Sequence, residues 1–402
     1  MKAYPNTIAF QIRRTNCVCS FLQGSAVNDT IANPALSRGK IPSLDGLRGI
    51  SFLIVFLSHA GLANVIPGRL GVNIFFLLSG YLITTLMIRE RERTGWISLK
   101  LFYLRRSLRI FPPMYTIMAA TLLYLAAVHH LGGVTLAGVC SQAFYFQNYY
   151  FHDGRGLIRG MAVLWSLAVE EHFYLLFPLL MLLFTTKFKM SYRQIAVALL
   201  CMCGTILVWR TFVALTFSNG LDWARDATDC RADSILFGCA LASWERTPSI
   251  ARVFTHKRLV RRILPASLAL LLLTLVYRNP VFRETIRYSI QGVALAPILY
   301  FFVHAPHSWI GRILNTRVLT TLGILSYALY LLHVTVLIEL SQVISSKLLA
   351  GILGLFVSIL LAYLVHLFVE KPTDAMRKKF RHNSGDHPNE QRSQRNTAIA
   401  LP

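Results

Sequence analysis

Ten long apolar stretches divide this chain, and they restrict its possible folds more than any other feature. They cover approximately residues 47–66, 70–88, 112–130, 167–186, 194–216, 232–246, 263–277, 288–304, 320–342 and 349–369. About 20 apolar residues in a helix span the hydrocarbon core of a bilayer, so each stretch predicts a transmembrane helix. The sixth and seventh are shorter and need tilt, extension or protein cover. The sequence therefore predicts an all-α fold, a polytopic transmembrane helical bundle of about ten spans.

The composition agrees with a membrane protein, because 54% of the residues are hydrophobic and only 15% are charged. A soluble fold with this composition would have too little polar surface to cover itself. The formal net charge of +23 raises the question of nucleic-acid binding. A nucleic-acid-binding protein gathers its basic residues on one soluble face, whereas here they lie between apolar spans. We therefore expect a lipid bilayer, and no nucleic acid, as a partner.

The basic residues also predict the orientation. The two tails and alternate loops hold 30 of the 41 lysines and arginines, and the other loops hold nine. Because lysine and arginine are retained on the cytoplasmic side, both termini are predicted to be cytoplasmic. The chain then divides into a basic polar cytoplasmic tail (1–41), a transmembrane domain (42–372) and a basic, disordered cytoplasmic tail (373–402). Pro372 is predicted to end the last helix.

The first span carries two titratable side chains, Arg48 and His59, in an otherwise uncharged helix. They are eleven residues apart, so on a regular helix they differ by roughly 20° in direction and about 16 Å along the axis. Both therefore lie on one face. Such residues inside a membrane are costly and usually face the bundle interior or a wet cavity, which favours a functional role.

Six motifs then follow one another between residues 42 and 372. They are Leu-Asp-Gly-Leu-Arg-Gly from Leu44 with Arg48 and His59, Phe75-Phe-Leu-Leu-Ser-Gly-Tyr-Leu-Ile83, Arg105-Arg-Ser-Leu-Arg-Ile-Phe-Pro-Pro-Met-Tyr115, Trp165-Ser-Leu-Ala-Val-Glu-Glu-His-Phe-Tyr174, Ser326-Tyr-Ala-Leu-Tyr-Leu-Leu-His333 and Glu370-Lys-Pro372. This series resembles acyltransferase family 3, whose integral membrane proteins O-acylate cell-surface sugars.

The resemblance implies an acyltransferase for groups other than amino-acyl groups, in a bacterial inner membrane. Its donor would be cytoplasmic acyl-coenzyme A, with acetyl-coenzyme A expected, and its acceptor a hydroxyl of a cell-envelope or exported carbohydrate. Family acceptors include O-antigens of lipopolysaccharide, exopolysaccharides and peptidoglycan. The residues leave open which acyl group, which glycan and which oligomeric state apply.

His59 is the candidate base for this chemistry. A sugar hydroxyl is a poor nucleophile near neutral pH, and histidine has a usual pKa of about 6.5, close to the working pH. Direct transfer and an acyl-histidine intermediate both use this residue and remain open. Arg48, nearer the cytoplasm, is expected to hold a polar part of the donor. Asp45 lies three residues before Arg48 and is positioned to fix its guanidinium group.

Three arginines in the 89–109 loop are candidates for donor binding. Arg105, Arg106 and Arg109 lie in a basic, amphipathic segment that is typical of an interfacial helix. Guanidinium groups match phosphate oxygens, as the resemblance requires for coenzyme A. Basic loop residues also contact lipid headgroups or set topology, and this alternative is equally open. Pro112 and Pro113 are predicted to start the third helix.

Other polar residues are assigned to supporting or acceptor-side positions. Trp165, Glu170 and Asp233 are expected near the acceptor, with Glu170 rather than Glu171 facing inward and Asp233 lining an external cavity with Arg210. Ser79, beside Gly80, indicates a small-residue packing site. His333, Glu339 and His366 are interpreted as hydrogen-bond partners between helices. The 131–164 loop carries residues suited to sugar binding or to membrane anchoring, namely Asn148, Tyr149, Tyr150, His152 and Asp153.

Several familiar motifs are missing from the sequence. The chain has no Gly-x-Ser-x-Gly, His-Glu-x-x-His, Cys-x-x-Cys or phosphate-loop motif, so neither a metal site nor a permanently bound cofactor is predicted. Cys17, Cys19, Cys201 and Cys203 are expected to be free thiols. Cys140 and Cys230 are both assigned to the external side, where an oxidising compartment permits a disulfide.

Three functional classes fit this pattern. The favoured one is the membrane O-acyltransferase. The second is a polytopic transporter that uses intramembrane histidine and arginine residues as a proton or ion relay, although no internal repeat between the halves supports it. The third is a membrane sensor or scaffold, which the many polar positions within spans disfavour.

Overall fold

The computed structural model describes residues 41, 43–150 and 155–382, and within them the chain is helical without a β-strand. Nine of the described helical segments are long and apolar enough to cross a membrane, so the chain is a multi-pass membrane protein. Their main helices are α2 (Leu44–Leu57), α3 (Gly68–Thr94), α4 (Leu99–Ala127), α7 (Leu164–Leu182), α8 (Tyr192–Thr216), α13 (Leu264–Val276), α15 (Ile286–His304), α17 (Arg317–Val343) and α18 (Lys347–Val365).

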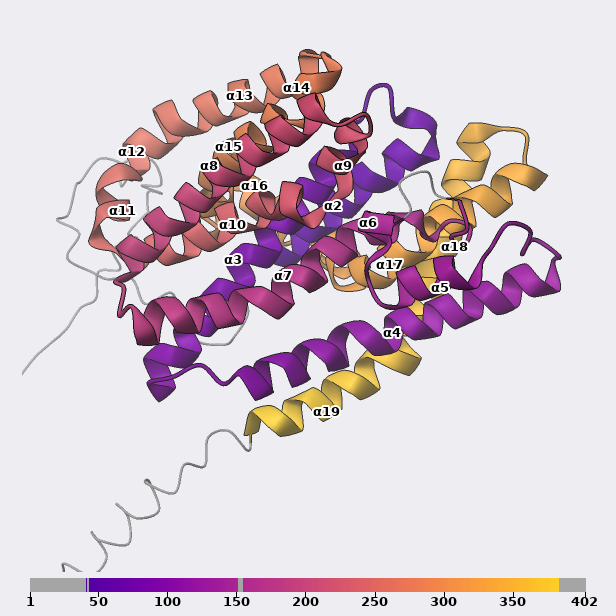
Figure 1. Cartoon of the computed structure of the whole chain (residues 1–402), viewed down its shortest axis with the longest axis horizontal. Coiled ribbons are helices and arrows are strands. Elements are labelled where there is room, and N and C mark those ends of the chain that lie inside the picture. Colours follow the sequence, from indigo (N-terminus) through magenta and orange to yellow (C-terminus); the bar gives the residue numbers. More distant parts are fainter. Residues whose placement is uncertain (1–40, 42, 151–154, 383–402) are drawn as a thin grey trace, which may run out of the picture. The chain divides into compact units, whose positions relative to one another are not determined.

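Shorter elements join or extend these helices. They are η1 (Ser58–Leu62), α5 (Leu136–Ala143), α6 (Gln147–Tyr150), η2 (Met161–Val163), η3 (Leu183–Lys187), α9 (Gly220–Asp226), α10 (Thr228–Trp244), α11 (Pro248–Val253), α12 (His256–Arg258), η4 (Leu259–Ile263), α14 (Pro280–Glu284), α16 (Trp309–Leu314), η5 (His366–Glu370) and α19 (Lys371–His382). Figure 1 shows the long helices running side by side as a bundle.

Helix α10 corresponds to the sixth predicted span, and its 17 residues make it shorter than each of the nine spanning segments, which have 19 residues or more. Its residues from Cys230 to Ser243 are almost all buried, with α3 and α8 packed along it. Its first residue, Thr228, accepts a hydrogen bond from the Asn148 amide at one end of the bundle. Just beyond its last residue, Arg246 lies 3.5 Å from Glu92 at the other end. Helix α10 therefore traverses the bundle, covered by protein as a short span requires.

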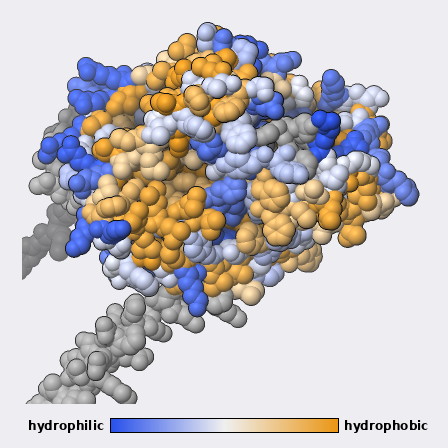
Figure 2. Space-filling model, viewed as in Figure 1, coloured by the Kyte–Doolittle hydropathy of each residue, from blue (hydrophilic) through white to orange (hydrophobic). Residues whose placement is uncertain are grey.

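The loops predicted to share a side of the membrane also meet in the structure. On the predicted cytoplasmic side, Arg246 lies 3.5 Å from Glu92 of the 89–109 loop, and Arg91 of that loop donates to the carbonyl oxygen of Thr185 at 3.1 Å. On the predicted external side, Arg69 pairs with Glu284 at 2.6 Å. Figure 2 shows broad apolar areas on the flank of the bundle and hydrophilic residues gathered toward its ends.

The centre of the bundle is held by a close approach of α3 and α10. A Cβ atom on Gly80 would meet the carbonyl oxygen of Ile235, and one on Gly238 would meet that of Leu77. Neither position has room for a side chain. Small residues let membrane helices pack backbone to backbone, so the predicted packing role of Gly80 is confirmed.

Two predicted helix boundaries are wrong. Helix α4 begins after Ser98, whose hydroxyl accepts from the backbone N–H of Leu101, and it continues through Pro112 and Pro113. The N-cap at Ser98 thus starts the helix earlier than the prolines do. Pro372 does not end the last helix either, because it lies in the first turn of α19, where proline is tolerated. Helix α19 packs along α4 (Figure 1).

The predicted tails fall mostly outside the described residues. Residues 1–40 and 383–402 are not described, so the cytoplasmic placement of both termini stays a prediction, as does the free state of Cys17 and Cys19. His152 and Asp153 of the external loop also lie outside the described ranges.

Candidate active site

Helix α2 carries Arg48 and leads directly into the π-helical turn η1, which carries His59. Within η1, Gly61 has a φ of 103°, a conformation that glycine adopts without strain. This residue breaks the helix just after His59. Single π-helical turns are frequent at functional sites because they reorient side chains away from the regular helix pattern.

His59 contacts a second histidine from helix α17. The Nδ1 atom of His59 lies 3.0 Å from the Nε2 atom of His333. The His333 side chain is fully buried, with its ring packed against Phe52 and Phe56, whereas His59 is exposed. The structure thus places an exposed histidine against a buried one.

The protonation pattern of this pair follows from the groups around it. The Nδ1 atom of His333 lies 2.8 Å from the carbonyl oxygen of Tyr330 and 3.2 Å from that of Leu329. A carbonyl oxygen only accepts, so Nδ1 of a neutral His333 carries the proton and its Nε2 is an acceptor. Nδ1 of His59 must then donate to it. On this hydrogen-bond assignment, the Nε2 atom of neutral His59 keeps a free lone pair.

The candidate donor region lies around Arg48. Its Nε atom lies 3.4 Å from the hydroxyl oxygen of Ser326, and the guanidinium group is within electrostatic range of Asp45, Glu170 and Arg109. Asp45 forms no ion pair with Arg48 in the structure, although it lies close enough to act on its charge. Arg48 therefore has one long hydrogen bond and no ion pair, and the charges around it act on its guanidinium group from a distance.

Glu170 lies in the Arg48 region, but Glu171 does not face away from it as predicted, because both side chains are half-buried and both charges act on Arg106. The two carboxylate oxygens of Glu170 accept hydrogen bonds from Ser79 at 3.1 Å and from Tyr174 at 2.8 Å. Ser79 is therefore a hydrogen-bond donor to Glu170 as well as a neighbour of the packing residue Gly80. The charge of Glu170 acts on both Arg48 and Arg106.

The three arginines of the predicted donor-binding segment lie in different surroundings. Arg105 is committed to an ion pair with Glu90. Arg106 lies over the ring of Tyr174, with 5.0 Å from its guanidinium carbon to the ring centroid. Arg109 acts electrostatically on both Arg48 and Arg106 and has no hydrogen-bond or ion-pair partner among the described residues. The structure thus brings Arg106 and Arg109 to the Arg48 region and places Arg105 beside it.

Asp233 and Arg210 lie away from any surface, unlike the predicted lining of an external cavity. Both side chains are fully buried, and Arg210 pairs with Asp233 at 2.9 Å. The hydroxyl group of Ser289 donates to the other carboxylate oxygen at 2.7 Å. This network joins α8, α10 and α15, so Asp233 contributes to helix packing.

Trp165 lies in an aromatic cluster around a buried arginine that the sequence reasoning did not single out. The Arg231 guanidinium carbon lies 5.5 Å from the Trp165 ring centroid and 3.6 Å from that of Tyr288. Trp165 also contacts Phe76 edge to face. The arginine and the three aromatic side chains come from four different helices, so no local sequence pattern predicts the cluster.

The external loop forms a second aromatic cluster, around Asp229. Its carboxylate accepts hydrogen bonds from the Tyr149 hydroxyl at 3.0 Å and from the indole nitrogens of Trp209 at 2.6 Å and Trp223 at 3.1 Å. Burial, and next the Asp229 charge, raises the pKa of Tyr149 to about 12. Tyr149 thus remains a neutral hydrogen-bond donor at physiological pH.

Of the residues predicted to pair between helices, Glu339 contacts other segments of the chain, whereas the interpretation of His366 is wrong. Glu339 of α17 lies 3.0 Å from His130 and 3.7 Å from Arg159, which fixes the external loop to the bundle. His366 lies 2.6 Å from Glu370 one turn later, within its own helical segment rather than between helices. His333, the third residue interpreted as a hydrogen-bond partner between helices, differs from Glu339 and His366 because it pairs with the candidate base, His59.

The predicted disulfide between Cys140 and Cys230 is wrong, because both thiols are free. Cys230 is fully buried on α10, where its sulfur lies 3.6 Å from a carboxylate oxygen of Asp229, whereas Cys140 lies on α5. Cys201 and Cys203 are free, as predicted. Within the described part of the chain, no three His, Cys, Asp or Glu residues are grouped as metal ligands would be.

Comparison with known proteins identifies relatives along most of this chain. The family model described as an acyltransferase domain matches residues 41–367. A peptidoglycan O-acetyltransferase of Listeria monocytogenes is 28% identical over 84% of this chain and 56% of its own length. A putative peptidoglycan O-acetyltransferase of Bacillus subtilis is 29% identical over 83% of this chain and 54% of its own. The chain thus spans about half the length of these relatives. No solved structure matches it.

Proposed function

The chain belongs to acyltransferase family 3, and on that premise we propose that it is a membrane O-acyltransferase that acetylates a hydroxyl of a cell-envelope carbohydrate. The named relatives support acetyl as the acyl group and a cell-wall glycan as the acceptor class. Acyl-coenzyme A on the cytoplasmic side is the proposed donor. Because these relatives are bacterial, the proposed location is the bacterial inner membrane.

The contact between His59 and His333 carries this proposal. Its geometry leaves Nε2 of His59 with a free lone pair on an exposed side chain. That atom is the one that a general base presents to an acceptor hydroxyl. His333 contacts no substrate in this scheme. It is a positioning residue, which holds His59 in one tautomer as a buried partner holds the histidine of a hydrolytic triad.

In the proposed acyl transfer, His59 acts first as base and then as acid. The acceptor hydroxyl gives its proton to Nε2 of His59 while its oxygen bonds to the thioester carbonyl carbon. The carbon–sulfur bond breaks, and the imidazolium group returns the proton to the departing coenzyme A thiolate. The same Nε2 atom also serves an acyl-histidine route, in which it attacks the thioester first.

Arg48, Arg106 and Arg109 are the proposed contacts for the polar parts of the donor. Three guanidinium groups gather at the cytoplasmic half of the bundle, where Glu170 offsets part of their charge. Guanidinium groups bind phosphate oxygens well, and the long arm of coenzyme A would extend from there toward His59. The separation of roughly 16 Å between Arg48 and His59 on one helix suits an extended donor.

A reconstitution experiment tests the function. The full chain is placed in liposomes and given acetyl-coenzyme A labelled in the acetyl group, with an oligosaccharide from a bacterial cell wall as acceptor. Label that appears on the oligosaccharide as an ester supports the proposal. Movement of the oligosaccharide or of protons across the membrane, with no thioester consumed, would instead identify a transporter.

A further inference from the structure

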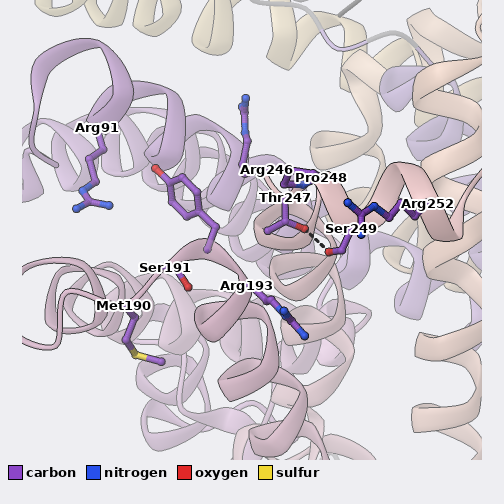
Figure 3. Close-up of a pocket in the computed structure, with 10 residues that line it drawn as sticks. Arg91, Met190, Ser191, Arg193, Arg246, Thr247, Pro248, Ser249 and Arg252 are labelled. Carbon is purple, nitrogen blue, oxygen red and sulfur yellow. Dashed lines mark hydrogen bonds between the residues drawn. The ribbon is translucent and has the colours of Figure 1, made fainter. Parts of the chain in front are cut away.

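A pocket of about 470 Å³ lies at the predicted cytoplasmic end of the bundle, away from the His59 and Arg48 regions. It lies between the end of α3, the start of α8 and the segment that joins α10 to α11. Four arginines line it, Arg91, Arg193, Arg246 and Arg252, together with the hydroxyl-bearing residues Ser191, Tyr192, Thr247 and Ser249. Figure 3 shows the labelled lining residues on three separate segments.

The charge of this arginine pocket is only partly compensated. No acidic residue lines it. Arg91 is held by the carbonyl oxygen of Thr185, and Arg246 lies 3.5 Å from Glu92 outside the pocket. Arg193 and Arg252 are exposed and have neither an ion pair nor a hydrogen bond with a described residue. The pocket is therefore a cationic site with unused guanidinium donors.

Hydrogen bonds keep the other lining groups in place. Thr247 and Ser249 share a hydrogen bond of 2.8 Å (Figure 3), and the Trp244 indole donates to Ser249 at 2.9 Å. Ser191 caps α8 through a reciprocal pair of hydrogen bonds with Gln194. The arginines therefore extend from anchored backbone segments, which favours a preformed site.

A second hollow continues from the arginine pocket onto the apolar flank of α8. It shares Met190, Ser191 and Arg193 with the pocket and reaches Val197 and Ala198. Val197 is 54% exposed, on a helix that is long and apolar enough to span a membrane and whose other exposed residues are mostly apolar. One recess is thus cationic at the predicted cytoplasmic end and apolar where it enters the membrane.

We propose that the arginine pocket binds the phosphate headgroup of an anionic phospholipid of the cytoplasmic leaflet, with an acyl chain along α8 past Val197. Guanidinium groups bind phosphate oxygens in a forked geometry, and anionic lipids are the abundant phosphates at this surface. The apolar extension decides between the two phosphate sources. A water-soluble phosphate, such as the coenzyme A donor, has no use for a lipid-facing groove.

Native mass spectrometry of the full chain tests this site. The protein is purified in detergent and titrated with phosphatidylglycerol or with phosphatidylcholine, and retained lipid is counted. We expect phosphatidylglycerol to be retained in preference. In R193Q/R252Q, each lost arginine should weaken binding about 5-fold, so that affinity for the lipid falls about 25-fold. The charge-matched control R258Q/R261Q removes two exposed arginines outside the pocket and should retain the lipid.

Three results would overturn the proposal. The first is equal retention of the two lipids by the unaltered protein, and the second is an equal loss in R193Q/R252Q and in the control, which would indicate diffuse charge. The third is displacement of phosphatidylglycerol by millimolar coenzyme A, which would assign the pocket to the donor instead. Acyl transfer in lipid-free detergent should be unchanged in R193Q/R252Q, so the lipid site and the proposed enzyme function can fail independently.

Discussion

Replacing His333 by alanine tests how the structure prepares His59 for catalysis. His333 is fully buried and offers one acceptor, its Nε2 atom, to Nδ1 of His59 at 3.0 Å. A neutral hydrogen bond of this kind contributes about 0.5–1.5 kcal/mol. Its loss lowers the population of the His59 form that presents Nε2, relative to the other tautomer and ring orientations, by a factor of roughly 2 to 13. We expect kcat of His333→Ala to fall on the order of tenfold, with KM for acetyl-coenzyme A unchanged.

The assay is initial-rate acetyl transfer per folded molecule, with folded protein measured by size-exclusion chromatography. His333→Gln keeps an acceptor oxygen near the place of Nε2 and should recover most of kcat. Phe52→Leu disturbs the packing around the same ring without removing a hydrogen bond, and it serves as the packing control. A loss in His333→Ala that His333→Gln does not recover, or an equal loss in Phe52→Leu, would refute the positioning role.

Three further outcomes are expected. Arg48→Ala should raise KM for acetyl-coenzyme A about 10- to 100-fold, because a hydrogen bond from a charged group to the donor is lost. Arg48→Lys keeps the charge and should raise KM less, and an unchanged KM in Arg48→Ala would remove Arg48 from the donor site. Gly80→Ala should lower the free energy of unfolding by about 1–3 kcal/mol, because its Cβ meets the Ile235 backbone. The control Gly204→Ala, whose Cβ lies in open space, should leave it unchanged, and equal effects of the two variants would contradict the packing account. Maleimide applied without reductant should label Cys140 and spare buried Cys230, and a non-reducing peptide map that joins them would restore the disulfide.

The overall fold was largely predictable because membrane spans are defined by composition. All ten predicted stretches are helical, and nine meet the length and apolarity of a span. Helix ends were less predictable. The Ser98 cap, not Pro112, starts α4, since a hydrogen-bonding side chain at the N-cap acts before a proline two turns or more inside the helix. Apolar composition therefore sets the spans, whereas capping side chains outside the apolar stretches set the helix ends.

The candidate site was predictable only where its members lie on one helix. Arg48 and His59 were singled out from their spacing within the first predicted span, and Glu170 from its motif. The partner of His59 was not, because His333 lies 274 residues away in the sequence and meets it only through the packing of α17 against α2. The burial of Asp233 and its ion pair could not be predicted either, because its partner Arg210 lies on another helix.

The central claim is that His59 is the base of an acyl transfer, and one comparison tests it most directly. Labelled acetyl transfer per folded molecule is measured for the unaltered chain, for His59→Ala and for His366→Ala, which removes a histidine paired with Glu370 outside the site. A general base contributes about 100- to 10,000-fold, so His59→Ala should lose at least 100-fold while His366→Ala stays near the unaltered rate. Near-normal transfer by His59→Ala would contradict the account.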